Sequence, residues 1–189
     1  MPSASISLTL PRILLDGLFA TAMLGTMCAV ASGQAASSGG AATQVEAMQK
    51  LAFLAGHWSG PVTIARGPGE PLHLTQTENV EYKLDGQVML IEGKSTGADG
   101  KVQFQALATI AYDESSHSYR FRAYHDGHYV DAELTVLADG FRWGFDAGPA
   151  HITNTMHLTK NGEWQETSEV AFGNHPAVRS VDMLLHHEP

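Results

Sequence analysis

After Gly56 the chain alternates apolar and polar residues in short runs, and most runs end at a tight-turn dipeptide. Alternation with a period of two predicts half-buried β-strands rather than helices. The turn dipeptides favour two-residue hairpin loops, whose central residues need positive φ; they are Asp-Gly at 85–86, 99–100, 126–127 and 139–140, and Asn-Gly at 161–162. The pattern therefore predicts consecutive strands at about 57–66, 72–84, 87–95, 101–112, 117–125, 128–137, 141–146, 150–160, 163–172 and 178–187.

The Asp-Gly pair at 126–127 tests this prediction most directly, because a one-residue slip in register moves every side chain to the opposite face of a sheet. A two-residue loop there places Phe121 opposite Ala132, on a face that is apolar along both strands. On the other face the same register places Arg122 opposite Asp131, an opposite-charge pair that favours this pairing. Both faces agree, so we expect a hairpin with this register.

Two further loops extend the hairpin pattern toward the C-terminus. A two-residue loop at 139–140 places Leu134 opposite Phe145, which continues the apolar face across a third strand. A two-residue loop at 161–162 places Lys160 opposite Glu163, again an opposite-charge pair. We therefore expect a meander, in which each strand pairs with the next one along the chain.

One short helix is predicted before the strands. Residues 43–46, Thr-Gln-Val-Glu, have the spacing of a capping box, in which a threonine begins a helix and a glutamate three residues later reaches back to it. Gly56 is suited to end that helix, because glycine readily adopts the left-handed conformation that follows many helices. Between these signals the apolar residues recur at helical intervals, at Val45, Met48, Ala52 and Ala55, with Leu51 and Leu54 beside them.

A long meander has two unpaired edges unless its first and last strands meet, and closure is the usual way to remove them. Ten strands exceed the roughly eight whose side chains can just fill a barrel, so an interior cavity is expected. The predicted fold is all-β: a roughly ten-stranded antiparallel up-and-down β-barrel with one short N-terminal α-helix that caps one end. Two packed sheets with a solid core are the alternative.

The N-terminal residues differ in composition from the rest of the chain. An apolar stretch ends at Ala29-Val30-Ala31, the small-x-small pattern of a signal-peptidase site, so residues 1–31 are expected to be a signal peptide. Residues 32–42 are mainly Gly, Ala, Ser and Gln and are expected to be a flexible leader, followed by one barrel domain at 43–189. A membrane anchor is the alternative for the first segment, although its uncharged run from Gly17 to Ala31 is shorter than the ~20 apolar residues of a membrane span.

Charge and cysteine content exclude several classes of function. The chain of 189 residues carries 11 Lys and Arg against 20 Asp and Glu, a net charge of −9. It has no run of basic residues to follow a phosphate backbone, so nucleic acid is not an expected partner. Cys28, the only cysteine, lies in the predicted signal peptide, so the exported chain would have no thiol nucleophile or cysteine metal ligand. We expect a periplasmic or secreted protein with no stable membrane insertion after signal cleavage.

Ten histidines raise the question of a metal or catalytic site. His125 and His128 flank a tight turn within reach of one ion, but the sequence fixes no third ligand. The two-residue loop at 161–162 would place His157 opposite Glu166, a pair that could act as a general base in a lumen. No nucleophile elbow, phosphate-binding loop or dinucleotide fingerprint occurs. The sequence therefore predicts no catalytic residue, no metal ligand and no cofactor.

Residues 53–60, Phe-Leu-Ala-Gly-His-Trp-Ser-Gly, resemble the Leu-x-Gly-x-Trp-x-Gly opening shared by nitrobindin-like and lipocalin-like bacterial barrels. The aromatic run at 140–145 and the closing segment at 181–185 are similar to an uncharacterised secreted branch of these calycin-type barrels. The resemblance implies a barrel that holds a small ligand. In nitrobindins a histidine near the start of the last strand ligates haem iron; the comparable position here is near Ser180, and His175 lies in the preceding loop.

The apolar face of the predicted hairpins indicates what the lumen would bind. The opposite face carries arginine and carboxylate side chains that are costly to bury, so the apolar face should point inward. Such a lumen suits a small apolar or aromatic ligand better than a sugar or phosphate. We expect an exported protein that binds or carries a small apolar molecule; a haem- or histidine-dependent enzyme using the same cavity is the alternative. The predicted ligand-binding residues are Phe104, Tyr119, Phe121, Leu134, Trp143 and Phe145.

The predicted signal-peptidase site gives a first testable expectation. The exported protein should begin near Ser32, with cleavage after Ala35 as the second choice, because the small-x-small site at 29–31 precedes a segment with no charge and no apolar periodicity. N-terminal sequencing of protein recovered outside the cytoplasm measures this directly. Exported protein that still begins at Met1 would show that the segment is not a cleaved signal.

Overall fold

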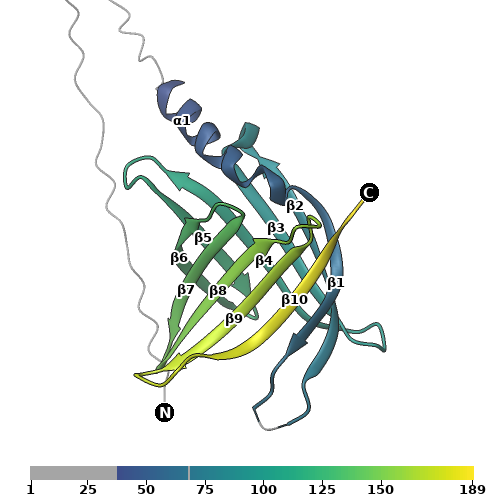
Figure 1. Ribbon diagram of the computed structural model, residues 1–189. Helices are drawn as coiled ribbons and strands as arrows, with labels where there is room; N and C mark the ends of the chain where they lie inside the picture. Colours follow the sequence, from purple (N-terminus) through teal and green to yellow (C-terminus); the bar gives the residue numbers. More distant parts are fainter. Residues whose placement is uncertain (1–37, 68) are drawn as a thin grey trace, which may run out of the picture. The chain divides into compact units, whose positions relative to one another are not determined.

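Ten antiparallel strands close into a barrel in the computed structural model, which describes residues 38–67 and 69–189 (Figure 1). Each strand pairs with its neighbour along the chain, and the first pairs with the last, which removes both edges. The predicted up-and-down barrel is confirmed, and the alternative of two packed sheets is wrong. The strands are β1 (Gly56–Ile64), β2 (Leu72–Lys83), β3 (Val88–Thr96), β4 (Val102–Asp113), β5 (Ser118–His125), β6 (His128–Val136), β7 (Gly140–Ala147), β8 (Ala150–Leu158), β9 (Trp164–Phe172) and β10 (Val178–Glu188).

The helical segment differs from its prediction at both ends. It begins at Ser38 rather than Thr43, so the end of the predicted flexible leader is helical, and it consists of α1 (Ser38–Met48) followed by a 3₁₀ helix, η1 (Gln49–Leu54). A 3₁₀ helix aligns side chains three residues apart. Met48, Leu51 and Leu54 are accordingly the fully buried stripe, whereas Ala52 is exposed. A second short 3₁₀ turn, η2 (Leu84–Gly86), joins β2 to β3.

The helical segment covers one end of the barrel through tyrosines that point up from the strands. The Tyr119 hydroxyl donates a hydrogen bond to the Ala47 carbonyl, and the Tyr82 hydroxyl donates to the Met48 carbonyl, both at 2.8 Å. Burial raises the pKa of both phenols, so both remain protonated donors at neutral pH. The predicted capping role of the helix is therefore confirmed.

Barrel closure between β1 and β10 explains the residues of the Leu-x-Gly-x-Trp-x-Gly opening. A Cβ atom on Gly60 would lie 2.1 Å from the Leu184 carbonyl oxygen, so only glycine lets β10 approach so closely. The buried Trp58 donates its indole N–H to the Leu54 carbonyl at 2.8 Å and packs edge-on against Trp164. The motif thus fixes the seam of the barrel and its passage into the helix.

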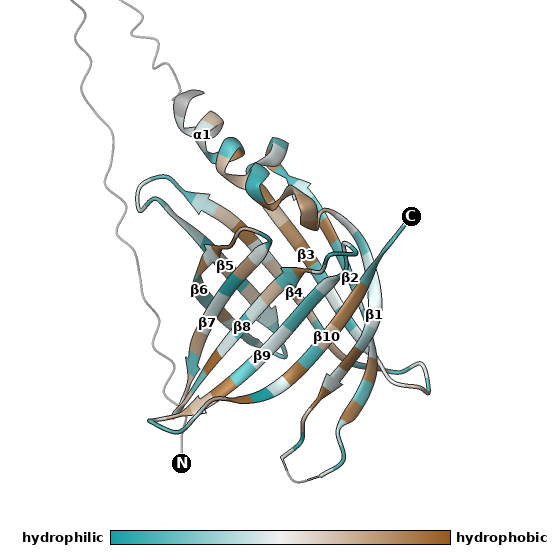
Figure 2. Cartoon of the chain, in the orientation of Figure 1, coloured by the Kyte–Doolittle hydropathy of each residue, from teal (hydrophilic) through white to brown (hydrophobic). Residues whose placement is uncertain are grey.

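The β5–β6 hairpin has the predicted register, with Phe121 opposite Ala132 and Arg122 opposite Asp131. Figure 2 shows apolar and polar residues alternating along the strands, as this register requires. On the outer face both Arg122 and Arg120 pair with Asp131, and their hydrogen bonds lower the pKa of that carboxyl. Arg120 lies opposite Glu133 in this register, but its guanidinium group pairs diagonally with Asp131.

The predicted register of the β6–β7 hairpin is wrong by two residues. Leu134 pairs with Trp143 rather than Phe145, because Gly140 is the first residue of β7 and not part of the turn. Gly140 has an ordinary negative φ; a Cβ atom there would lie 1.8 Å from the Met156 carbonyl oxygen. Glycine is therefore required at position 140 because the backbone of β8 lies so close. The Asp-Gly dipeptide pattern does not reveal this requirement.

The predicted register of the β8–β9 hairpin is wrong by one residue, which reverses its faces. The loop has three residues rather than two, with Gly162 at φ +76°, and it pairs Met156 rather than His157 with Glu166. His157 consequently lies on the outside, where its Nδ1 is 2.9 Å from Asp139 Oδ1. Glu166 points into the barrel. The two side chains therefore lie on opposite faces of the wall, and the predicted pairing of His157 with Glu166 as a general base is wrong.

Strands β6 and β7 pair only over a short stretch. In the part of the chain that the structure describes, the ladder joins 134–136 to 141–143 and no further residues of these two strands. Val130 and Phe145 line the interior on either side of the separated portions. The wall of the barrel is therefore least complete beside its aromatic face.

The predicted signal peptide, residues 1–31, and the first part of the leader lie outside the described residues. Within residues 38–67 and 69–189, no helix has the length and apolar character needed to span a bilayer.

Gly140 gives a prediction for the stability of the barrel. Gly140→Ala should lower the free energy of unfolding by about 3 kcal/mol, because the new methyl group must push β7 away from β8. Gly148→Ala is the matched control: its φ is +59°, but a Cβ atom there meets nothing within 4 Å, so only about 1 kcal/mol of backbone strain is expected. Urea unfolding followed by tryptophan fluorescence measures both. Equal losses would contradict the close-contact explanation.

Candidate functional site

A cavity of about 420 Å³ lies inside the barrel and has two chemically different walls. One wall, contributed by β4 to β7, is apolar and largely aromatic. The other, contributed by β2, β3, β8, β9 and β10, carries polar side chains. We call these the aromatic wall and the polar wall; the polar wall comprises Gln76, Glu78, Ser95, Asn154, Glu166, Ser168 and Ser180.

The aromatic wall is a run of stacked rings. The ring centroids of Phe121 and Trp143 are 4.1 Å apart with an interplanar angle of 27°, and those of Trp143 and Phe145 are 5.6 Å apart at 13°. Phe104 lies 5.4 Å from the His125 ring and is 38% exposed, which places it at the edge of the cavity. Small residues beside these rings leave the space open; they are Ala106, Ala108 and Ala123.

Four of the six predicted ligand-binding residues line the cavity: Phe104, Phe121, Trp143 and Phe145. The other two do not. Tyr119 is turned toward the helical segment, where its hydroxyl donates a hydrogen bond to the Ala47 carbonyl. Leu134 is 2% exposed and belongs to the packed hydrophobic core. The alternation along β5 and β6 assigned both residues to the correct face. It could not show that the helix fills that level of the barrel.

The polar wall is held by side-chain hydrogen bonds. The Gln76 amide donates to Glu78 Oε1 at 2.7 Å and accepts from the Ser95 hydroxyl. On the other side the Ser168 hydroxyl donates to the amide oxygen of Asn154. Polar side chains inside a barrel are stable only when paired in this way, so the network fixes the orientation of each group.

Glu78 is the most perturbed of these groups. Burial inside the barrel, partly opposed by the Gln76 hydrogen bond and reinforced by the charge of Glu166, raises its pKa to about 8. Its second carboxyl oxygen, Oε2, is buried and has no hydrogen-bond partner among the described residues. Gly93 lies directly across the ladder, and a Cβ atom there would come within 2.7 Å of that oxygen. Glycine at this position therefore makes room for the carboxyl.

Glu166 is the second carboxyl in the cavity. Burial raises its pKa to about 7, while a hydrogen bond of 2.9 Å from the Trp164 indole N–H acts in the opposite direction. Neither carboxyl has a cationic partner: of the titratable side chains that line the cavity in the described part of the chain, the only other one is His125. Glu78 is therefore mostly protonated at neutral pH, and Glu166 is about half protonated.

Sequence reasoning missed Glu78, although it left a signal, and gave Glu166 the wrong partner. Glu78 and Gln76 alternate in step with Leu74 and Val80, which are buried inward residues of β2. That phase predicts two inward polar residues, and it was available from the sequence. Glu166 left no such signal, because its face depends on the number of residues in the preceding loop.

The histidines do not form a metal site. His125 lines the cavity with its Nδ1 buried and without a hydrogen-bond partner, whereas His128 is exposed on the neighbouring strand. No group of three potential metal ligands occurs among residues 38–67 and 69–189. Haem ligation through the position comparable to nitrobindins does not fit either. Ser180 occupies it and donates its hydroxyl to the Ser168 carbonyl, and His175 is exposed in the preceding loop.

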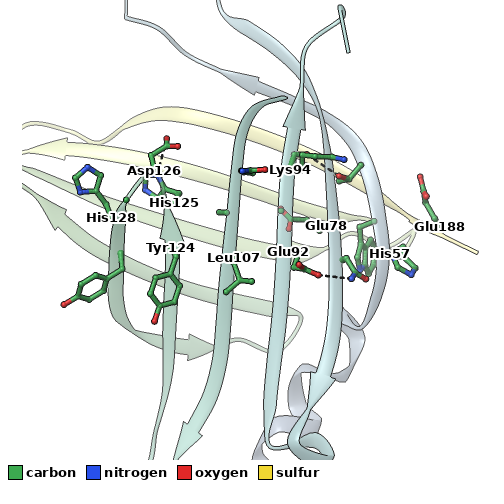
Figure 3. Close-up of a pocket in the computed structure, with 18 residues that line it drawn as sticks. His57, Glu78, Glu92, Lys94, Leu107, Tyr124, His125, Asp126, His128 and Glu188 are labelled. Atoms are coloured by element: carbon green, nitrogen blue, oxygen red, sulfur yellow. Dashed lines mark hydrogen bonds and ion pairs between the residues drawn. The ribbon is translucent and has the colours of Figure 1, made fainter. Parts of the chain in front are cut away.

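A second hollow of about 1030 Å³ crosses β1 to β6 at the level of Glu92 and Tyr124, whose side chains point away from the lumen (Figure 3). This outer groove is larger than the lumen but more exposed and more charged: His57 and Lys94 also line it, and Tyr129 is 68% exposed. An enclosed site removes more of a small ligand's surface from water than an open groove does. The lumen is therefore the better candidate site.

Comparison with known proteins supports the barrel fold. No protein-family model matches the sequence, and no curated protein matches it. Among solved structures the chain is similar to Rv2717c from M. tuberculosis, with a TM-score of 0.58 and 12% sequence identity over 76% of this chain and 98% of that chain. Similarity at this identity shows a shared fold alone. Membership of the calycin-type family stays a prediction.

The buried carboxyls predict how stability depends on pH. Their folded pKa values lie above the ordinary value of 4.5, so the folded state is favoured at low pH and loses stability as pH rises through about 7 and 8. Glu166→Gln stays neutral and should exceed the wild type in unfolding free energy by roughly 2–3 kcal/mol at pH 9, with little difference at pH 5. Urea unfolding at both pH values measures this, with the exposed Glu169→Gln on the same strand as control. A wild-type stability that rises toward pH 9 would contradict the assignment.

Proposed function

We propose that this barrel binds a small, flat aromatic molecule with a polar edge inside its lumen. The main observation is that the aromatic wall shares the cavity with buried polar atoms that have no hydrogen-bond partner. In the described part of the chain, Glu78 Oε2 and Asn154 Nδ2 are buried without a hydrogen bond, and both residues line the cavity. Unpaired buried polar atoms are destabilising, so a ligand that pairs them would gain affinity.

The shape of the cavity supports the same class of ligand. A volume of about 420 Å³ lies in the range of small-molecule sites, and the stacked rings of Phe121, Trp143 and Phe145 offer a flat face. This refines the sequence-based expectation of an apolar ligand: the polar wall requires complementary hydrogen-bonding groups.

A binding or carrier role fits these observations better than an enzymatic one. The expected export signal would place the protein in the periplasm or outside the cell, where it would meet its ligand. No observation favours the haem- or histidine-dependent alternative, since the lumen offers no histidine at the position that the resemblance to nitrobindins requires. Oligomeric partners and membrane association form no part of the proposal.

The neutral, environment-sensitive dye N-phenyl-1-naphthylamine tests the proposal. The wild type should bind it with a blue-shifted emission, and Trp143→Ala should weaken binding by about fivefold or more, because the central ring of the aromatic wall is lost. Ala106→Leu should also weaken binding, since a larger side chain there enters the cavity.

Tyr129→Ala is the matched control for the dye titration. It removes an aromatic ring of the outer groove without changing the lumen. Unchanged affinity is expected. If Tyr129→Ala abolishes binding while Trp143→Ala does not, the dye occupies the outer groove and the proposed site is wrong. Failure of the wild type to bind any apolar dye would likewise contradict an open lumen.

A further inference from the structure

Two carboxyls share one enclosed cavity without a cation to balance them. Glu78 comes from β2 and Glu166 from β9, and each receives only one hydrogen bond, from Gln76 and Trp164 respectively. In the described part of the chain no lysine or arginine lines the lumen. Two acids buried in this way destabilise the fold when ionised. An occupant of the lumen that carries a positive charge would remove that cost.

We propose that the ligand of the lumen is a cationic aromatic amine, whose ring lies on the aromatic wall and whose ammonium group binds Glu78 and Glu166. The inference rests on the proposed ligand-binding function and names the chemical class of its ligand. An ammonium group has three N–H donors and no acceptor, so it can satisfy the unpartnered Oε2 of Glu78 and still donate to Glu166.

The polar wall is otherwise well prepared for a cation. The Gln76 and Trp164 donors occupy one oxygen of each carboxyl and fix its orientation. The same two donors oppose the effect of burial on both pKa values, which keeps ionisation within reach at neutral pH. Gly93 keeps the space beside Glu78 clear. An anionic ligand would instead meet two acids and no cation.

Binding of such a ligand is coupled to a proton. In the free lumen Glu78 is mostly protonated near neutral pH and Glu166 is about half protonated, so binding of an ammonium ion displaces protons from these carboxyls to solvent. Affinity should therefore rise between pH 6 and pH 8.5, since an alkylammonium stays charged below about pH 10. The other titratable groups near the pair are His125 in the lumen and, in the outer groove that Glu78 also lines, His57, Glu92, Lys94, Tyr124, Asp126, His128, Tyr129 and Glu188.

Tryptamine and its neutral isostere tryptophol test the proposal by isothermal titration calorimetry on the full chain. Tryptamine should bind at least about tenfold more tightly than tryptophol at pH 8.5, and about tenfold less tightly at pH 6 than at pH 8.5. Repeating the titration in buffers of different ionisation enthalpy should show net proton release. The anion indole-3-propionate should not bind.

Variants of the two lumen carboxyls test whether these groups cause the preference for tryptamine. Glu78→Gln and Glu166→Gln should each reduce the ratio of tryptamine to tryptophol affinity toward one and weaken its pH dependence. Glu169→Gln, which removes an exposed carboxyl from the outer face of the same strand, should leave both unchanged. If either lumen variant fails to fold, the isostere ratio and proton release of the wild type still decide the question.

The outcomes separate this inference from the proposed function. If tryptophol binds as tightly as tryptamine, the preference for a cation is wrong and the lumen remains a site for aromatic ligands. The same holds if apolar dyes bind in the lumen but neither indole compound does. If no dye and no indole compound binds, the proposed function itself is wrong, and the amine inference is wrong with it.

Discussion

Closure of β1 onto β10 is the constraint on which the rest of this structure depends. It requires glycine at position 60, where β10 lies too close for any side chain. It also places Trp58 under the helical segment, where the indole N–H donates a hydrogen bond to the Leu54 carbonyl. Once the seam is closed, alternate residues of every strand must point into one enclosed space. Residues that an open sheet would leave in water, Glu78 and Glu166 among them, are then held inside the barrel.

Those two carboxyls are the costliest groups to bury among the polar side chains of the lumen. The helical segment packs one end of the barrel with Met48, Leu51 and Leu54, which are fully buried and contribute through the hydrophobic effect. The middle of the barrel is not packed with large apolar side chains in the same way. Small residues and glycine leave a cavity there, and polar groups face it. A stability-optimised barrel would fill that level. Loss of packing combined with unpaired polar atoms is typical of a binding site.

The similarity to Rv2717c shows that the fold alone does not determine which side chains line the lumen. At 12% identity the two chains share a barrel, and a barrel of this kind sets only where a cavity lies. Which molecule enters depends on the individual side chains of its wall. In this chain the wall combines stacked rings such as Phe121 and Trp143 with two acids.

The sequence by itself determined the strands, the meander and most of the aromatic wall, because period-two alternation and turn dipeptides are local properties. It also contained the inward phase of Glu78 in its alternation with Leu74 and Val80. It favoured a barrel over two packed sheets, but only the pairing of β1 with β10 decided between them. Tertiary structure alone decided the rest. Gly140 serves contact with β8 rather than a turn, and a third loop residue before β9 turns Glu166 inward. Loop length and close strand contacts depend on neighbouring backbone, and a single-residue difference exchanges inside and outside.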